Sequence, residues 1–150
     1  MPKSFKARLH KACIDMLEDR VARLQQAIAH AQQAASDDTK SSAGDKFETS
    51  REMMKLEIDK NSTLLSQANV MLQHLHRLNA SAKMDTVAFG SLVHTNEGIY
   101  YFSVSLGKIA LGDKVCFALS MVSPIGKALG GHKAGETVAF MGRKVVIEAI

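Results

Sequence analysis

The sequence has little of several residue types that mark common protein classes. It contains no Trp, two Tyr and six Phe, so aromatic residues make up 5% of its 150 residues. Eight Met and many Leu and Ala suit helix packing better than an aromatic-rich β core. The two cysteines, Cys13 and Cys116, lie far apart within apolar patterns. This placement predicts two reduced, buried thiols in a cytosolic protein.

Long apolar runs are missing as well. No run approaches the ~18 residues that a membrane-spanning helix needs, and the N-terminus lacks the uninterrupted apolar region of a signal peptide. We therefore expect a cytoplasmic protein with no membrane partner. The net charge of +4 permits an anionic partner without requiring one. The histidines and cysteines lack metal-ligand spacing, and no nucleotide-binding fingerprint is present.

The chain changes character near residue 83. Only Gly44 of the ten glycines and Pro2 of the two prolines precede that point, and most β-branched residues follow it. A helical half followed by a β-rich half indicates an α+β fold. We expect two domains, at residues 1–83 and 84–150.

Two apolar stripes run through the helical half with the alternating three- and four-residue spacing of a coiled-coil seam. Their positions are Ile14, Leu17, Val21, Leu24, Ile28, Ala31 and Ala35, and then Met54, Ile58, Asn61, Leu65, Ala68, Leu72 and Leu75. The polar stretch 36–44 separates the stripes and predicts a turn. The simplest arrangement is an antiparallel helical hairpin in a monomer, with an acidic tip near residues 36–50. A coiled-coil adaptor that dimerises through the seams is an alternative.

The β-rich half alternates strand-like runs with turn residues. Its pattern predicts strands at residues 86–93, 99–105, 114–119, 136–140 and 144–149. A short helix is expected between the third and fourth of these strands. Ser123 suits its N-cap, Pro124 its first position and Gly130 its end.

This C-terminal stretch resembles a known family. Residues 123–138, SPIGKALGGHKAGETV, are similar to the Ser-Pro…Ala-Leu-x-Gly-x-x-x-Gly-Asp-x-Val signature of the Gre transcript-cleavage factors, and residues 87–93 to the strand that opens their C-terminal domain. The order of the two halves also matches. The resemblance implies an N-terminal antiparallel α-helical coiled-coil hairpin followed by a small FKBP-like α+β domain.

The resemblance also implies a function. Gre factors insert their coiled coil through the secondary channel of bacterial RNA polymerase, where two tip acids help to hold a catalytic Mg²⁺ while the polymerase hydrolyses its backtracked transcript. Gly44, Asp45 and Glu48 match the family's glycine and two acids in spacing. Asp45 and Glu48 are therefore the implied catalytic and metal-sharing residues. The implied partners are bacterial RNA polymerase and the 3′ end of the nascent RNA. The protein is then not itself an enzyme, and its only cofactor is the Mg²⁺ of the polymerase.

The neighbours of these acids depart from the family motif, Gly-Asp-Leu-x-Glu-Asn-x-Glu-Tyr. Lys46 stands for the Leu, Thr49 for the Asn, Arg51 for the second Glu and Glu52 for the Tyr. These departures leave open a second reading, a regulator that occupies the channel of the polymerase without stimulating cleavage.

A purely structural role for the two acids is also open. Asp45 and Glu48 fit a capping box at a helix start, in which each bonds to a backbone N–H of the first turn. Thr49 and Glu52 offer a second capping box. If Thr49 caps the helix, Asp45 and Glu48 stay in the turn.

The remaining candidates are partner contacts. Four basic residues near the tip are candidates for contact with RNA, although a solvated helix face is their ordinary role: Lys40, Lys46, Arg51 and Lys55. The resemblance also implies that Ser123 and Pro124 lie near the surface that docks on the polymerase. An FKBP-like domain raises prolyl isomerisation as a further alternative, against which the scarcity of aromatics argues.

Overall fold

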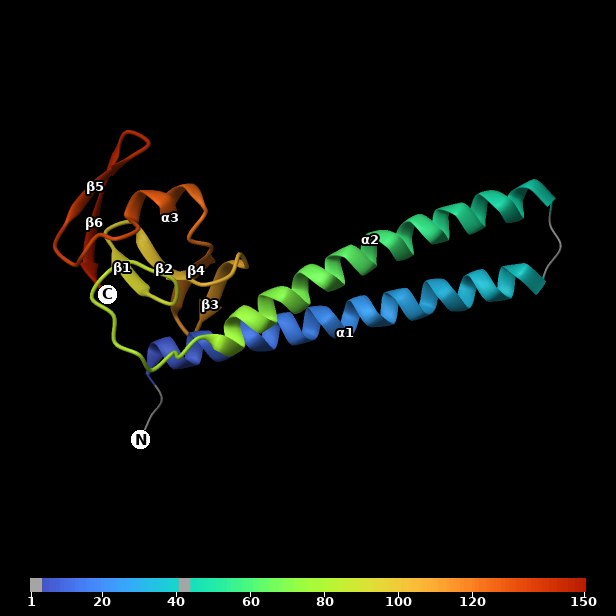
Figure 1. Ribbon diagram of the computed structural model, residues 1–150, viewed down its shortest axis with the longest axis horizontal. Helices are drawn as coiled ribbons and strands as arrows, with labels where there is room; N and C mark the ends of the chain where they lie inside the picture. The colour runs from blue at the N-terminus through green and yellow to red at the C-terminus, as the bar shows by residue number, and fades with distance from the viewer. Residues whose placement is uncertain (1–3, 41–43) are drawn as a thin grey trace. The chain divides into compact units, whose positions relative to one another are not determined.

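The structure is a computed structural model that describes the backbone of residues 4–40 and 44–150 and the side chains of residues 4–37 and 49–150. Two long helices come first, α1 (Phe5–Lys40, 36 residues) and α2 (Gly44–Arg77, 34 residues). In the described part of the chain, a six-stranded sheet and one short helix follow (Figure 1). The predicted α+β fold class, a helical hairpin followed by a small α+β domain, is confirmed.

The chain folds as two compact units whose boundary crosses both long helices. The hairpin unit comprises Asp15–Gln73, and the sheet unit comprises Met1–Ile14 together with His74–Ile150. The first turns of α1 and the last turn of α2 therefore belong with the sheet rather than with the hairpin.

Burial along α1 and α2 follows the predicted seams. Every seam position is buried or half-buried, including Asn61, the one polar seam residue. Apolar residues beside the seam stay exposed, with Met53 at 66% and Leu56 at 69%. The three- and four-residue spacing was therefore a correct guide to the face of each helix that is covered.

The two helices extend further than the sequence predicts. α1 continues through Lys40, so residues 36–40 are helical rather than part of a turn. α2 begins at Gly44, which places Thr49 inside the helix and Asp45 at its second residue. The prediction that Thr49 caps this helix is therefore wrong, and the prediction of a cap by Asp45 depends on a side chain outside the described residues. Helix propagation adds one backbone hydrogen bond for each residue fixed, and here it overrides the weak helix preference of these polar residues.

The sheet contains β1 (Leu92–Thr95), β2 (Gly98–Phe102), β3 (Gly107–Leu111), β4 (Lys114–Leu119), β5 (Thr137–Phe140) and β6 (Arg143–Ala149). The strand order is β3-β4-β2-β1-β6-β5. β2 and β4 are parallel, and the other neighbouring pairs are antiparallel. β4 has its predicted bounds, whereas β3 was not predicted.

The first predicted strand, over residues 86–93, needs correction. β1 begins only at Leu92. A turn precedes it, closed by a hydrogen bond from the Ser91 N–H to the Ala88 carbonyl, and Gly90 has a φ of +95°. An L side chain at Gly90 would be strained in this conformation. The glycine therefore marks a turn and not the middle of a strand.

The short helix α3 (Pro124–Leu129) has the predicted cap, Ser123, and it lies over one face of the sheet (Figure 1). Its buried face joins the core of the sheet unit, a cluster formed by Val87, Val93, Phe102, Ile125, Leu129, Val145 and Ile147. Gly126 is buried in the same helix, and a Cβ added there would lie 2.6 Å from the Ser120 carbonyl oxygen. The close approach of α3 to the chain before it therefore requires glycine at this position.

The substitution Gly126→Ala should destabilise the sheet unit by about 1–3 kcal/mol, since the added methyl group meets backbone that cannot move aside. Urea unfolding followed by tyrosine fluorescence measures this, because both tyrosines, Tyr100 and Tyr101, belong to the sheet unit. Lys127→Ala, at an exposed position of α3, is the control and should leave the midpoint unchanged. Equal midpoints for Gly126→Ala and the wild type would contradict the packing described here.

Candidate functional site

Two places carry the predicted site residues, and the first is the start of α2. Asp45 and Glu48 are the second and fifth residues of this helix. Residues three apart on a helix share a face, and acidic residues suit the positive end of the helix dipole. The side chains of both acids lie outside the described residues, as do those of Lys40 and Lys46. The backbone therefore places the two acids on one face of the first turns of α2.

Two basic residues that follow the acids along α2 are open to solvent. Arg51 and Lys55 are both exposed and lie four residues apart on α2, so they share a face of the helix. Exposed cations in such an arrangement can meet a phosphate backbone. Both residues are therefore exposed on one face of α2, and their contact with RNA stays a prediction.

The second place is the start of α3. The Ser123 Oγ accepts a hydrogen bond from the Gly126 N–H at 3.1 Å and donates one to the Ser120 carbonyl at 2.6 Å. The hydroxyl therefore holds the helix start in place. Pro124 follows at the first helical position and is exposed. Of the two predicted docking residues, Pro124 offers a surface to a partner, whereas Ser123 serves mainly as a cap.

Beside this helix start lies a cavity of about 450 Å³, here called the aromatic pocket. Aromatic and aliphatic side chains form its walls, with Tyr100 from β2, Phe117 and Leu119 from β4, Ile125 from α3 and Phe140 from β5. The pocket is also lined by a second group of residues, here called its mouth: Glu97, Ser123, Pro124, Met141 and Arg143. The sequence does not predict this pocket, because its aromatic residues come from separate strands.

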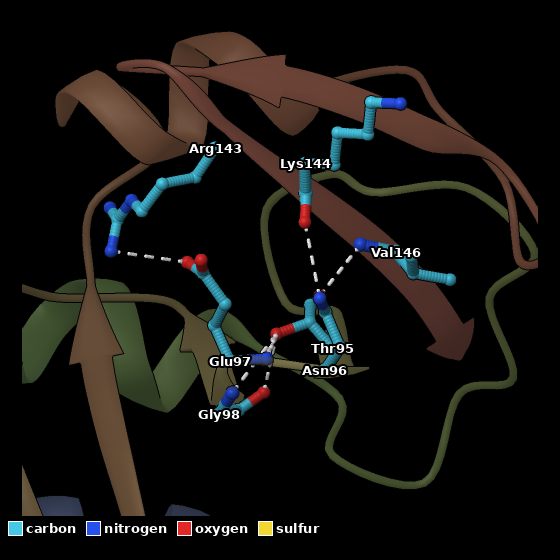
Figure 2. A network of polar contacts seen from close by, with 7 residues as sticks. All are labelled: Thr95, Asn96, Glu97, Gly98, Arg143, Lys144 and Val146. Atoms are coloured by element: carbon cyan, nitrogen blue, oxygen red, sulfur yellow. Dashed lines mark hydrogen bonds and ion pairs between the residues drawn. The ribbon is translucent and has the colours of Figure 1, made fainter.

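The mouth of the pocket carries an ion pair. Arg143 Nη1 lies 3.4 Å from Glu97 Oε2, and the guanidinium carbon lies 5.8 Å from the centre of the Phe140 ring. Glu97 belongs to the β1–β2 turn, where Thr95 Oγ1 accepts hydrogen bonds from the N–H groups of Glu97 and Gly98, both at 3.1 Å. Figure 2 shows this turn facing Arg143. The turn thus fixes the position of Glu97, the acidic partner of Arg143.

A second set of bonds fastens the same turn to β6. The Asn96 side chain donates to the Lys144 carbonyl at 3.1 Å and accepts from the Val146 N–H at 2.8 Å (Figure 2). A side-chain amide that bonds to the backbone of another strand at two points restricts motion in both. The ion pair of Glu97 and the hydrogen bonds of Asn96 therefore both fasten the β1–β2 turn to β6 at the mouth of the aromatic pocket.

His10 connects the start of α1 to the sheet within the sheet unit. Its Nδ1 lies 2.7 Å from the Tyr101 hydroxyl, and Tyr101 is fully buried. Burial lowers the pKa of His10, and the nearby His76 and Lys6 lower it further, while a hydrogen bond to the Leu75 backbone opposes the shift. The neutral imidazole is thus the form that the folded protein favours.

The cysteines are buried and unbridged, and their predicted burial is confirmed. Burial raises the pKa of the Cys13 thiol to about 12, with a further contribution from Cys116. The pKa of Cys116 is also raised, again by burial. Because a thiol reacts as its thiolate, neither residue is suited to nucleophilic chemistry at neutral pH.

No group of three or more His, Cys, Asp or Glu within the described part of the chain is placed to hold a metal ion. None of the helices among the described residues combines the length and hydropathy needed to cross a bilayer.

Comparisons with known proteins were made for the whole chain. No protein-family model and no curated protein matches it. Among solved structures, the chain is similar to that of the transcription factor Gfh1, with 21% sequence identity and a TM-score of 0.36 over 94% of this chain and 92% of that chain. Values this low establish neither a family nor a function.

The lowered pKa of His10 predicts that the sheet unit loses stability in mild acid. The unfolded chain binds this proton more readily than the folded protein. The contribution of His10 is therefore complete above a pH of about 6.5 and is lost as the pH falls below that value. Urea midpoints followed by tyrosine fluorescence between about pH 7.5 and 5.5 should fall less steeply in His10→Gln than in the wild type.

The matched control for this experiment is His30→Gln, at an exposed position on α1. It should keep the wild-type slope of midpoint against pH. If His10→Gln kept that slope as well, His10 would not be the group responsible.

Proposed function

We propose that this protein is a Gre-like transcription elongation factor. It binds bacterial RNA polymerase through the secondary channel and stimulates cleavage of backtracked transcripts. The observation that carries the proposal is the Gly44-Asp45-x-x-Glu48 sequence at the start of α2, in a long helical hairpin. At ~1.5 Å per residue, the 34 residues of α2 extend about 50 Å. A hairpin of that length can carry its tip into a channel that a folded domain cannot enter.

The chemistry of the two acids supports this role. Mg²⁺ prefers oxygen ligands, keeps several waters and takes one or two carboxylates from protein. In the polymerase active site, the ion supplies charge neutralisation and an activated water for phosphodiester hydrolysis. Asp45 and Glu48, three residues apart on one helix face, are suited to share it. The protein is then an accessory factor, without a cofactor of its own, that completes the active site of the polymerase.

The basic residues beside the acids fit the same proposal. Arg51 and Lys55 are exposed on α2, and Lys40 and Lys46 flank the tip in sequence. These cations would contact the phosphates of the displaced RNA 3′ end. The protein would act as a monomer in the cytoplasm.

A specific observation favours a second candidate, a regulator that occupies the channel without stimulating cleavage. Lys46 follows Asp45 directly, and Arg51 lies three residues beyond Glu48 on the same helix. Arg51 is close enough in helical position to pair with Glu48 and compete with a metal ion, whereas Lys46 adds positive charge to the same turn of the helix. In this case binding would inhibit stalled polymerase complexes rather than rescue them.

The double substitution Asp45→Asn and Glu48→Gln should abolish stimulated cleavage, because the amides cannot supply anionic ligands to Mg²⁺. Polymerase binding should stay within about twofold, since each amide keeps the shape of the carboxylate that it replaces. The measurement is Mg²⁺-dependent shortening of RNA from its 3′ end in a backtracked complex, with binding measured in parallel.

The control is Asp59→Asn, at an exposed acid further along α2. This variant should stimulate cleavage as the wild type does. Full cleavage by the double variant would remove the assigned roles of Asp45 and Glu48. Binding of the wild-type protein without cleavage would select the channel regulator instead.

Pro124→Ala should weaken polymerase binding by roughly threefold to tenfold if the start of α3 docks on the polymerase, as expected for one exposed contact in an interface. Cleavage should recover at saturating protein, because the tip acids are untouched. Lys108→Ala, at an exposed position of the edge strand β3, serves as the control. Unchanged binding by Pro124→Ala would place the docking surface elsewhere.

A further inference from the structure

We propose that a second cavity, here called the basic cavity, binds a phosphate monoester with a small apolar body. Its lining comes from the start of α1, the connection between α2 and β1, β1 itself and the end of β6. All these segments belong to the sheet unit, so the inference does not depend on the proposed function, whose tip acids lie in the hairpin unit. The volume of about 570 Å³ falls within the range of ~300–1,000 Å³ that is typical of ligand sites.

Three basic side chains from three separate segments line this cavity. They are Lys6 of α1, Lys83 of the connection and His94 of β1. Lys6 and His94 are half-buried, and Lys83 is exposed. No Asp or Glu contributes to the lining, and the ion pairs found among the described residues include none of these three side chains. A cavity lined by charge of one sign concentrates ions of the opposite sign, so the basic cavity favours an anion.

Lys6 has the most to gain from an anion in the cavity. Its ammonium donates to the Ala82 carbonyl over 3.3 Å, which is longer than the ~2.9–3.0 Å of a typical N–H···O bond. An ammonium has three donors, so this bond leaves others for a ligand. Burial lowers the pKa of Lys6, because the charged form loses part of its hydration. An anion bound beside the ammonium would replace that lost stabilisation.

The lining also contains one carboxylate, which the basic residues outnumber. Ile150 is the last residue of the sequence and lines the cavity, so its α-carboxylate adds one negative charge there. One charge balances at most one of the two lysines, Lys6 and Lys83. The lining therefore keeps a net positive charge, before any contribution from protonation of His94.

The kind of basic residue favours phosphate over carboxylate. Arginine binds a carboxylate through two parallel N–H···O bonds, whereas lysine acts as a point charge that suits phosphate. The lining of the basic cavity contains no arginine. A phosphate monoester also presents three terminal oxygens, one for each of Lys6, Lys83 and His94, whereas a carboxylate has two.

Apolar side chains in the same lining favour an ester over inorganic phosphate. They are Met84, Leu92 and Ile150. Leu92 is buried, and the other two are half-buried. Phosphate alone would leave this apolar surface in contact with water, whereas the organic group of an ester covers it. Met84 has a flexible side chain that can adapt to the shape of that group.

The test is a calorimetric titration of the full-length protein with four probes: phenyl phosphate, phenol, benzoate and inorganic phosphate. At a pH of about 7.5, a phosphate monoester is mainly a dianion. Phenyl phosphate should bind about tenfold more tightly than phenol and at least about threefold more tightly than benzoate or inorganic phosphate. In two-dimensional amide NMR spectra, it should shift the signals of Lys6, Lys83 and His94.

Three results would overturn the proposal. Phenyl phosphate might not bind, or it might bind no more tightly than one of the other probes, or it might shift only signals away from the basic cavity. In particular, equal or tighter binding of benzoate would make the cavity a carboxylate site. All titrations are made without polymerase, so their outcome is independent of transcript cleavage.

Lysine variants locate the charged part of the site. Lys6→Gln and Lys83→Gln should each weaken binding of phenyl phosphate roughly threefold to tenfold, because each removes a charged donor. Lys127→Gln is the matched control, since Lys127 is an exposed lysine of α3 outside the cavity. Urea midpoints show whether each variant is folded. If Lys127→Gln weakened binding as much as the other two, the anion would bind to surface charge in general, and the proposal would be wrong.

A further variant tests the apolar part of the site. Met84→Ala should weaken binding of phenyl phosphate roughly threefold to tenfold, because it removes apolar contact area from the lining. It should leave the affinity for inorganic phosphate unchanged, since the three basic side chains remain. An equal loss of affinity for both probes would contradict the assignment of an apolar body to the ligand.

Discussion

The fold depends on one apolar stripe along α1, part of which is buried in the sheet unit and part in the hairpin unit. Leu9, Cys13 and Leu17 are each fully buried. Their four-residue spacing keeps them on one side of the helix. The first two belong to the sheet unit and the third to the hairpin unit. Burial of a leucine side chain contributes about 1.5–3 kcal/mol, so neither unit can release α1 without exposing part of this stripe.

The parts of the fold that local pattern determines were predictable, and those that tertiary pairing determines were not. The seams and the Ser123 cap depend on spacing within a few residues, which the sequence displays directly. Strand β3 was missed because it is short and becomes a strand only by pairing with β4. The sequence predicts the end of α1 too early and the start of α2 too late. Cooperative propagation carries a helix through residues that favour turns in isolation.

The aromatic pocket could not be predicted from composition. The chain has few aromatic residues, yet the fold places three of them around one cavity. Tyr100 and Phe117 are paired directly because β2 and β4 run parallel in that register. A parallel pair needs a crossover connection between its strands, here the one that contains β3. No local pattern in the sequence announces such a pairing, so the pocket became visible only in three dimensions.

Under the proposed function, the helical placement of Asp45 and Glu48 bears on how their carboxylates would compete for partners. In a turn, their separation would vary, whereas on one helix face residues three apart keep their Cβ atoms about 5–6 Å from each other. Arg51 lies three residues beyond Glu48 on the same helix and so shares its face. Pairing of Glu48 with Arg51 and binding of Glu48 to a metal ion therefore exclude each other. An exposed ion pair on a helix contributes only about 0.3–0.5 kcal/mol. A divalent ion already held by other ligands attracts a carboxylate more strongly than one solvated cation does. Under the proposed function, metal sharing would therefore prevail wherever the polymerase presents Mg²⁺, and Arg51 would compete only in its absence.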